Sequence, residues 1–253
     1  MPHQKVVFPG AMGHDLAARL DTPEGDIKAY ALFAHCFTCG KDLNAINRVA
    51  RSLGEDGIAL FRFDFTGLGR SNGDFANTNF SSNVQDLVAA AGFMRAEMTA
   101  PSIMIGHSLG GAATLVAAPL VPEVKAVATI GAPFNSANVL KQFGADLSRI
   151  EQDGEAKVML AGRPFKIKQQ FVEDARTQNV TDSIKSMRKA LLVMHSPIDE
   201  TVGVDHARQI YEAAKHPKSF ISLDKADHLL MKRPEDGIYV ARVLSAWASQ
   251  YIN

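Results

Sequence analysis

The sequence predicts an α/β fold, with a mostly parallel central sheet flanked by helices and a small cap insertion. Strand-like and helix-like segments alternate along most of the 253 residues, which is typical of a parallel sheet covered on both faces. Residues 103–118 run from an apolar strand through a glycine-bounded turn into an alanine-rich helix. The alternation stops over residues 134–187. We therefore expect a core formed by 1–133 and 188–253, with 134–187 as the cap.

The core elements follow, in chain order, from hydrophobic periodicity. Short apolar or alternating runs predict strands, and apolar residues spaced three and four apart, as in residues 82–98, predict helices. The predicted strands are Lys5–Phe8, Asp15–Leu20, Ile27–His35, Ile58–Phe63, Ser102–Ile105, Val124–Ile130, Ala190–His195 and Ser219–Leu223. The predicted helices are Asp42–Leu53, Ser82–Met98, Ser108–Ala118, Val204–Ala214 and Pro234–Tyr251.

The inserted segment has its own pattern. It is expected to hold a helix-like piece near Ala137–Gln142, a hairpin of Lys157–Leu160 and Phe165–Ile167 that turns at Ala161–Pro164, and a polar helix near Gln169–Arg176. Long connections in compact domains usually carry function, so a cap over an active site is the favoured interpretation. A longer surface connection is the alternative.

Composition argues against several classes of protein. Lys plus Arg and Asp plus Glu are both 27, so no net charge favours nucleic acid or an anionic membrane as partner. No apolar run is long enough to span a membrane, and the N-terminus lacks the pattern of a secretory signal. We expect a cytoplasmic protein without a membrane span, and a homodimer is left open.

The most informative motif is G-x-S-x-G, formed by Gly106, Ser108 and Gly110. A preceding strand and a following helix are the context of a nucleophile elbow, a sharp turn whose flanking positions must lack bulk. Such a turn holds the serine hydroxyl at a helix N-terminus, where the helix dipole favours negative charge. The alternative is a helix start of small residues without a chemical role. The surrounding elements favour Ser108 as a catalytic nucleophile.

A catalytic serine needs an adjacent base, and in this arrangement the partners follow in the order nucleophile, acid, histidine. His228 comes just after the last predicted strand, where a loop can bring it over the serine. His195 ends a strand, His206 lies inside a predicted helix, and His216 precedes a proline. We interpret these three as structural or surface residues and assign His228 as the general base.

The acid is expected to be Asp199. It follows a predicted strand and a turn at Pro197, where a buried carboxylate can hold one histidine nitrogen and fix its tautomer. Glu200 is the rival, one residue away. Asp224 and Asp227 are also near the histidine in sequence, but residues this close along the chain rarely have suitable geometry.

The tetrahedral intermediate also needs hydrogen-bond donors at its oxygen. One is expected to be the main-chain N–H of Leu109, directly after the nucleophile. The other should come from the loop after the third predicted strand, with Phe37 preferred and Cys36 as the alternative.

Two further features of the sequence need an interpretation: the cysteine pair on this loop, and Asp64. The chain has only two cysteines, Cys36 and Cys39, which is too few for a disulfide scaffold. We assign them a packing role, with redox chemistry as a less favoured alternative and a metal site disfavoured for want of further ligands. Asp64 lies in a glycine-rich stretch that lacks the phosphate-loop pattern, and we interpret it as a structural residue that binds loop amides.

The cap mixes apolar residues with many charges, which suits a layer with one face on an acyl pocket and one in water. Phe143, Leu147, Phe165 and Phe171 are the expected substrate-binding residues.

With these residues assembled, the chain resembles the α/β-hydrolase superfamily over nearly its whole length. More narrowly, it is similar to the bacterial hydrolase found alone or fused to an OsmC-like, peroxide-related domain. The supporting stretches are His35–Cys39, Arg62–Gly69, Thr78–Val84, Gly106–Gly111 and Ala128–Pro133. The resemblance implies a catalytic triad of Ser108, Asp199 and His228 and an esterase-type activity.

The expected function is a serine hydrolase that cleaves small-molecule carboxylic esters of short to medium acyl chains through an acyl-enzyme intermediate. A peptidase or amidase and a thioesterase are alternatives, because the same triad serves them. A non-catalytic binding protein on a hydrolase scaffold is the alternative from another class. No metal ion or organic cofactor is expected.

Overall fold

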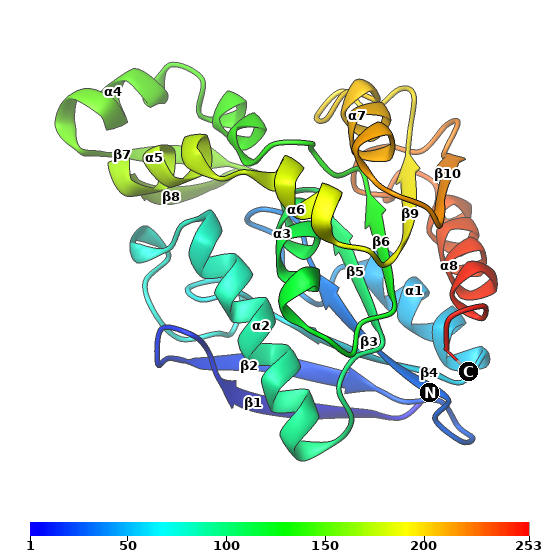
Figure 1. Cartoon of the computed structure of the whole chain (residues 1–253). Coiled ribbons are helices and arrows are strands. Elements are labelled where there is room, and N and C mark those ends of the chain that lie inside the picture. The colour runs from blue at the N-terminus through cyan, green and yellow to red at the C-terminus, as the bar shows by residue number, and fades with distance from the viewer. Residues whose placement is uncertain (253) are drawn as a thin grey trace.

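The computed structural model describes residues 1–252, and its centre is an eight-stranded sheet with helices on both faces (Figure 1). The strand order is β1-β2-β4-β3-β5-β6-β9-β10. The six strands from β4 to β10 in this order pair in parallel, and β1 and β2 pair antiparallel at one edge. The strands are β1 (His3–Pro9), β2 (Asp15–Asp21), β3 (Ala29–Ala34), β4 (Ile58–Phe63), β5 (Ile103–His107), β6 (Ala126–Ile130), β9 (Ala190–His195) and β10 (Lys218–Ser222). The predicted fold class is confirmed.

The helices divide the apolar core into two layers, one on each face of the sheet. On one face α1 (Asn44–Glu55) packs against α8 (Pro234–Ala248). On the other face lie α2 (Phe80–Glu97), α3 (Leu109–Ala117) and α7 (Asp205–Ala213). The central strands β3, β4 and β5 are buried along their length, because helices cover both of their sides.

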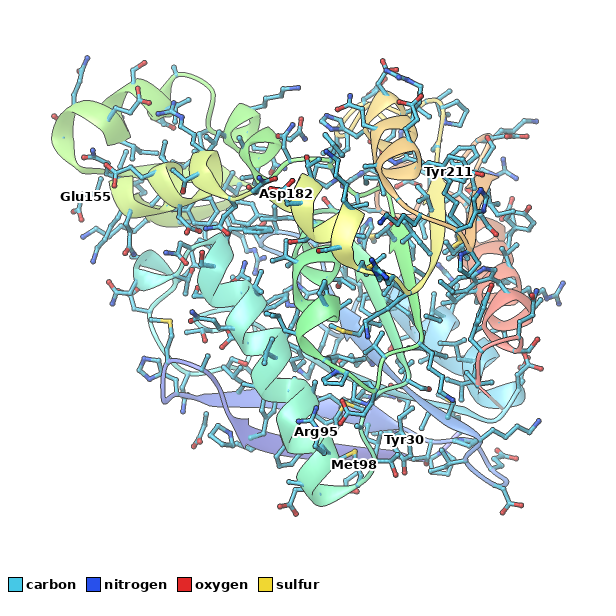
Figure 2. The ribbon with its side chains drawn as sticks, viewed as in Figure 1. Tyr30, Arg95, Met98, Glu155, Asp182 and Tyr211 are labelled. Carbon is cyan, nitrogen blue, oxygen red and sulfur yellow. A yellow bond between two sulfur atoms is a disulfide. The ribbon has the colours of Figure 1, made fainter. Side chains whose placement is uncertain are left out.

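Residues 134–187 leave the sheet after β6 and rejoin it at β9. They form η3 (Ser136–Phe143), α4 (Asp146–Asp153), β7 (Glu155–Leu160), β8 (Arg163–Lys168), α5 (Gln169–Thr177) and α6 (Val180–Ser186). Figure 1 shows most of this segment above the carboxyl ends of the parallel strands. Glu155 lies at its outer edge (Figure 2). The last helix, α6, packs against α3 and α7 of the core.

Three local differences from the sequence expectations have physical reasons. Helix α4 was not expected, because its sequence DLSRIEQD offers only two apolar positions. The helix near Ala137–Gln142 is a 3-10 helix. The hairpin turns at Ala161 and Gly162 alone, both at positive φ, as in a two-residue turn whose twist matches the strands. The expected four-residue turn is therefore wrong, and Arg163 begins β8.

Both ends of the described chain lie by the amino ends of the parallel strands, away from the inserted segment (Figure 1). Met1 lies against Gly54 at the end of α1, and Ile252 lies near Ile58, the first residue of β4.

Candidate active site

Ser108 occupies the sharp turn between β5 and α3. Its backbone angles, φ 54° and ψ −128°, lie in a region that side chains rarely adopt. The helix therefore begins one residue later than expected, at Leu109. A Cβ at Gly106 would lie 2.5 Å from the carbonyl oxygen of Gly110 and from the side-chain oxygen of Thr114. The glycines are needed because strand and helix cross at contact distance here.

Ser108, His228 and Asp199 form one hydrogen-bonded chain. The Oγ atom of Ser108 lies 2.9 Å from Nε2 of His228, and Nδ1 of His228 lies 2.7 Å from Oδ2 of Asp199. The three residues follow β5, β9 and β10. All three strands are parallel, so their carboxyl ends lie on the same side of the sheet. Ligands bind at the carboxyl ends of the strands in open α/β sheets. The geometry is that of a nucleophile, a base and an orienting acid.

Asp199 is held as a carboxylate by its neighbours. Its Oδ1 accepts hydrogen bonds from the main-chain N–H groups of Thr201 and Val202, both at 2.9 Å. Burial alone would raise the pKa of Asp199, but hydrogen bonds from His228 and from these amides outweigh burial and lower it. Its rival Glu200 is exposed to solvent and makes no hydrogen bond to His228 within residues 1–252.

Within residues 1–252, the other candidate histidines make no hydrogen bond to Ser108. His195 is fully buried and donates from Nε2 to the carbonyl oxygen of Val202, 2.7 Å away. His206 accepts the main-chain N–H of Phe134, at the start of the inserted segment, with its Nδ1 at 3.1 Å. His216 is exposed.

His107 is a contact of the site that sequence reasoning missed. Its Nε2 donates to the main-chain oxygen of His228 at 2.7 Å, and the two rings lie 5.2 Å apart. Burial, and then the neighbouring His228, lower the pKa of His107 to about 3, so the ring is neutral at physiological pH. His107 therefore fixes the backbone of His228 without adding charge. Its place inside the G-x-S-x-G motif was the only available signal.

Gly131 is a second position that was missed. It follows β6 with φ 56°. A Cβ there would lie 3.3 Å from both Oδ2 of Asp199 and Nδ1 of His228. A side chain at this position would press on the acid–base pair.

The expected oxyanion donors lie on two adjoining segments. Leu109 is the first residue of α3, so its N–H has no partner inside the helix. Phe37 lies on the loop after β3, and Gly110 packs directly against the carbonyl of His35 at the start of that loop. Within residues 1–252, neither the N–H of Phe37 nor that of Leu109 donates a hydrogen bond.

Cys36 and Cys39 form a disulfide, which the sequence analysis did not predict. The two Cα atoms lie 5.3 Å apart, and the N–H of Cys39 donates to the carbonyl of Cys36 at 3.1 Å. A single tight turn thus brings the sulfur atoms together.

Asp64 has the structural role expected for it. Its carboxylate accepts the main-chain N–H groups of Lys41 at 2.7 Å and Arg70 at 3.0 Å, and it pairs with the Lys41 ammonium at 2.9 Å.

The four expected substrate-binding residues of the cap differ in exposure. Phe143 and Phe171 are each 2% exposed, and both pack against the ring of Phe37. Phe165 and Leu147 are partly buried. Phe143 and Phe171 thus pack the inserted segment against the loop that carries Phe37.

Three further features of the described residues concern ligands and membranes. Within residues 1–252, no group of three or more His, Cys, Asp or Glu side chains could hold a metal ion. None of the helices in this range has both the length and the apolar character that a membrane span requires.

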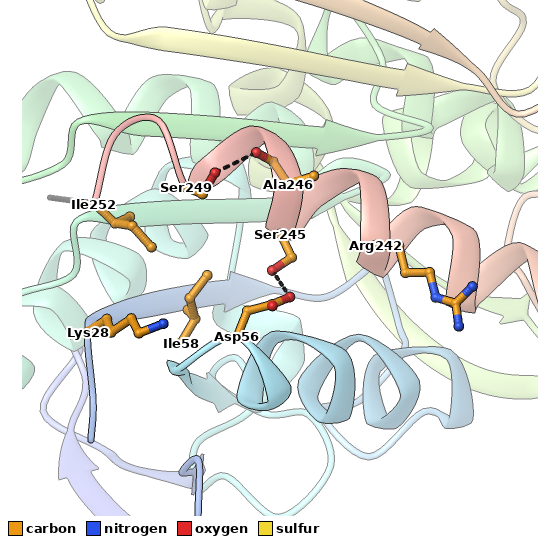
Figure 3. A pocket seen from close by; sticks show the side chains of 8 residues that line it. All are labelled: Lys28, Asp56, Ile58, Arg242, Ser245, Ala246, Ser249 and Ile252. Carbon is orange, nitrogen blue, oxygen red and sulfur yellow. Dashed lines mark hydrogen bonds between the residues drawn. The ribbon is translucent and has the colours of Figure 1, made fainter. Parts of the chain in front are cut away.

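A cavity of about 470 Å³ lies beside α8 (Figure 3). It is lined in part by Lys28, Ile58 and Ile252, at the amino ends of the parallel strands, opposite the edge that carries Ser108.

Comparison with solved structures supports the same fold. The crystal structure of the esterase domain from a Rhodothermus marinus protein is 46% identical, with a TM-score of 0.81 and complete coverage of both chains. Est1E from Butyrivibrio proteoclasticus, solved with ferulic acid bound, is 22% identical, with a TM-score of 0.84 over 98% of this chain and 99% of that one. This second likeness shows the fold.

Comparison by sequence adds a relative and a family. The rat protein "Palmitoyl-protein thioesterase ABHD10, mitochondrial" is 28% identical over 205 residues, or 78% of this chain and 66% of that protein. The family described as Hydrolase_4, serine aminopeptidase S33, matches residues 25–156, just over half of the chain. That stretch includes Ser108 and ends before Asp199 and His228. The chain therefore belongs to the Hydrolase_4 family, within the α/β-hydrolase superfamily.

Proposed function

We propose that this protein is a serine esterase with Ser108 as nucleophile, His228 as general base and Asp199 as the orienting acid. The observation that carries the proposal is the continuous hydrogen-bonded chain of these three side chains, with links of 2.9 and 2.7 Å. Ser108 is also presented on a strained turn at the start of a helix, as nucleophiles of this fold are.

The proposed reaction proceeds through an acyl-enzyme. His228 takes the proton of Ser108 as the serine oxygen attacks the ester carbonyl, and Asp199 stabilises the imidazolium. The N–H groups of Phe37 and Leu109 bind the oxyanion of the tetrahedral intermediate. His228 then gives its proton to the leaving alcohol. Water, activated by His228, releases the acid and restores Ser108.

The proposed substrates are small-molecule carboxylic esters of short to medium acyl chains. The 46% identical Rhodothermus marinus structure carries the name esterase domain, which supports ester chemistry. We propose that residues 134–187 act as a cap that limits acyl length, with Phe143, Leu147, Phe165 and Phe171 near the acyl group. Their apolar side chains and partial to full burial support this role.

A thioesterase is the second candidate, because the rat relative and a mouse relative at 26% identity are both named palmitoyl-protein thioesterase. The chain spans 66% and 65% of the length of these proteins. A peptidase or amidase is a weaker candidate that rests on the family's description alone.

Three finer points stay predictions: kinship to hydrolases fused to OsmC-like domains, a homodimer and a cytoplasmic location. The disulfide offers a test of the last one, because cytosolic thiol buffers keep most cysteines reduced. Alkylation of Cys36 and Cys39 in freshly lysed cells would report whether the pair meets a reducing compartment.

A panel of substrates tests the proposed activity. Wild type and Ser108→Ala are compared on p-nitrophenyl esters from acetate to palmitate, on acyl thioesters of the same chain lengths and on p-nitroanilides. We expect ester turnover that falls at least about 10³-fold in Ser108→Ala, since residual rate would come only from oxyanion binding. Faster cleavage of matched thioesters would favour the second candidate. Near-normal turnover in a folded Ser108→Ala variant would remove Ser108 from the mechanism.

A further inference from the structure

The cap contacts the oxyanion loop, residues 35–40, through Arg163. This residue opens β8 at the tip of the hairpin, and its Nη2 donates a hydrogen bond to the main-chain oxygen of Thr38. Thr38 has φ 60°, a left-handed conformation that is costly for a residue with a branched Cβ. A contact from outside the loop helps to hold such a conformation.

A series of aromatic rings extends the same contact to Phe37. The guanidinium of Arg163 lies 5.3 Å from the centre of the Phe165 ring, within the range of a cation–π interaction. Phe165 packs edge-on against Phe75, with ring centres 5.0 Å apart, and Phe75 lies 5.8 Å from Phe37. Arg163 thus touches the loop backbone directly at Thr38 and the Phe37 side chain through two rings.

Inside the loop, covalent and hydrogen bonds restrict motion. The disulfide joins Cys36 to Cys39, and His35 donates from Nδ1 to the carbonyl oxygen of Cys36 at 2.8 Å. A loop tied internally in this way moves largely as a unit. His35 at the start of the loop lies against Gly110, and Lys41, directly after the loop, is bonded to Asp64. Between these two ends, the cap contact at Thr38 helps to set the position of the Phe37 N–H relative to Ser108.

We propose that Arg163 is a positioning residue for the oxyanion hole: from the cap, it holds the loop so that the Phe37 N–H faces the developing oxyanion. This inference rests on the proposed function, and it gives the cap a part in the chemical step besides the selection of substrate size. Loss of a single oxyanion donor costs about 10²–10³-fold in kcat, and a donor displaced by about 1 Å can cost up to about 10²-fold. Loss of Arg163 should fall within this second range.

Three variants separate this role from simple stabilisation of the cap. Arg163→Met removes the hydrogen bond and keeps an apolar stem over Phe165, and Arg163→Lys restores one donor. Arg149→Met is the matched control, because the exposed Arg149 lies in the same cap and, within residues 1–252, bonds only with Asp146.

Steady-state kinetics on p-nitrophenyl butyrate are read together with inhibition by a trifluoromethyl ketone, which forms an oxyanion on the serine. For Arg163→Met we expect kcat to fall about 10- to 100-fold with KM nearly unchanged, because the lost interaction acts in the transition state. The ketone should bind weaker by a similar factor. Arg163→Lys should recover part of both losses, and Arg149→Met should match wild type.

Two results would overturn the proposal. One is an unchanged kcat and unchanged ketone affinity in a folded Arg163→Met variant. The other is a loss confined to KM or shared equally by Arg149→Met, which would mark a general effect of the cap. If wild type cleaves no ester, the proposed function fails by itself. The contact between Arg163 and the loop is then tested by amide hydrogen exchange at residues 37–40. Exchange should be faster in Arg163→Met than in Arg149→Met, and equal rates would refute the contact.

Discussion

The two halves of the candidate site, the nucleophile elbow and the oxyanion loop, are held in place in different ways. At the elbow, short-range backbone geometry is decisive: Gly106 and Gly110 let strand and helix meet, and Ser108 accepts a strained conformation. The oxyanion loop is closed by a disulfide and is contacted by side chains far away in the sequence, such as Arg163 and Phe171. Chemistry that relies on the elbow should therefore be sensitive to few residues, while oxyanion binding should respond to changes across the cap.

The largest expected effect comes from a change of Asp199, the acid that holds the base of Ser108. Asp199→Asn should lower kcat about 10²–10⁴-fold, because the wrong histidine tautomer is then favoured. Glu200→Gln, one residue away and exposed, is the matched control and should retain activity. Ester turnover and a pH–rate profile of both variants provide the measurement. If kcat falls in Glu200→Gln and not in Asp199→Asn, the acid is misassigned.

A second prediction concerns pH and the elbow's His107. Its pKa is about 3 in the folded protein, and an unfolded histidine titrates near 6.5. Between these values the unfolded state binds the proton and the folded state does not, so stability falls as pH decreases below 6.5. In His107→Gln this contribution is absent, so the free energy of unfolding should fall less steeply with decreasing pH than in wild type. The two slopes should differ by up to about 1.4 kcal/mol per pH unit.

Urea unfolding of wild type and His107→Gln from pH 7 to pH 4 measures the difference in slope. The buried His35 and His195 also have lowered pKa values, but both remain in the variant, so their effect cancels. Parallel stability profiles would show that His107 is not held neutral by its surroundings.

The cap side of the comparison predicts a change in acyl preference. Alanine at Phe143, Leu147, Phe165 or Phe171 should shift the chain-length profile, since each methylene of a bound chain is worth about 1 kcal/mol or more of discrimination. Phe143 and Phe171 pack on Phe37, so their variants should also lose kcat on every chain length. Profiles on p-nitrophenyl esters from acetate to laurate separate the two effects. Five coincident profiles, wild type included, would make the segment a surface connection.

The smallest expected effect concerns the disulfide. It closes a loop with a sequence separation of only 3, so reduction should cost no more than about 2 kcal/mol of stability. Ester hydrolysis should persist in reductant and in excess chelator, because Arg163 and the Phe37 ring still hold the loop and the triad uses no metal. Melting temperature and initial rates with and without dithiothreitol measure both effects. Loss of activity on reduction would mean that the disulfide governs the loop.

The sequence predicted the strand, sharp turn and helix around Ser108 because the requirements of this geometry are local. Glycine at positions 106 and 110, an apolar strand before and a small-residue helix after all lie within a few residues of Ser108. The core strands Ile58–Phe63 and Ala190–His195 match their predicted bounds, because buried parallel strands are near-continuous apolar runs.

The features that were missed depend on residues far apart in the chain. Arg163 contacts Thr38 across 125 positions and His107 contacts His228 across 121, and no local pattern encodes such pairs. The disulfide was missed for another reason: its two cysteines were judged by number, although their spacing alone permits a bond across one turn. Helix α4 was missed because it is mostly polar.

The positions of Met1 and Ile252 decide where a label or linker can be attached. Met1 and Ile252 lie by the amino ends of the parallel strands, while Ser108 follows the carboxyl end of β5. A fluorescent protein, an affinity tag or a surface linker attached at either end would thus stand on the far side of the molecule from the nucleophile. Immobilising the protein through one terminus should leave access to Ser108 unobstructed, and the same placement would let a second catalytic module be tethered without blocking the first.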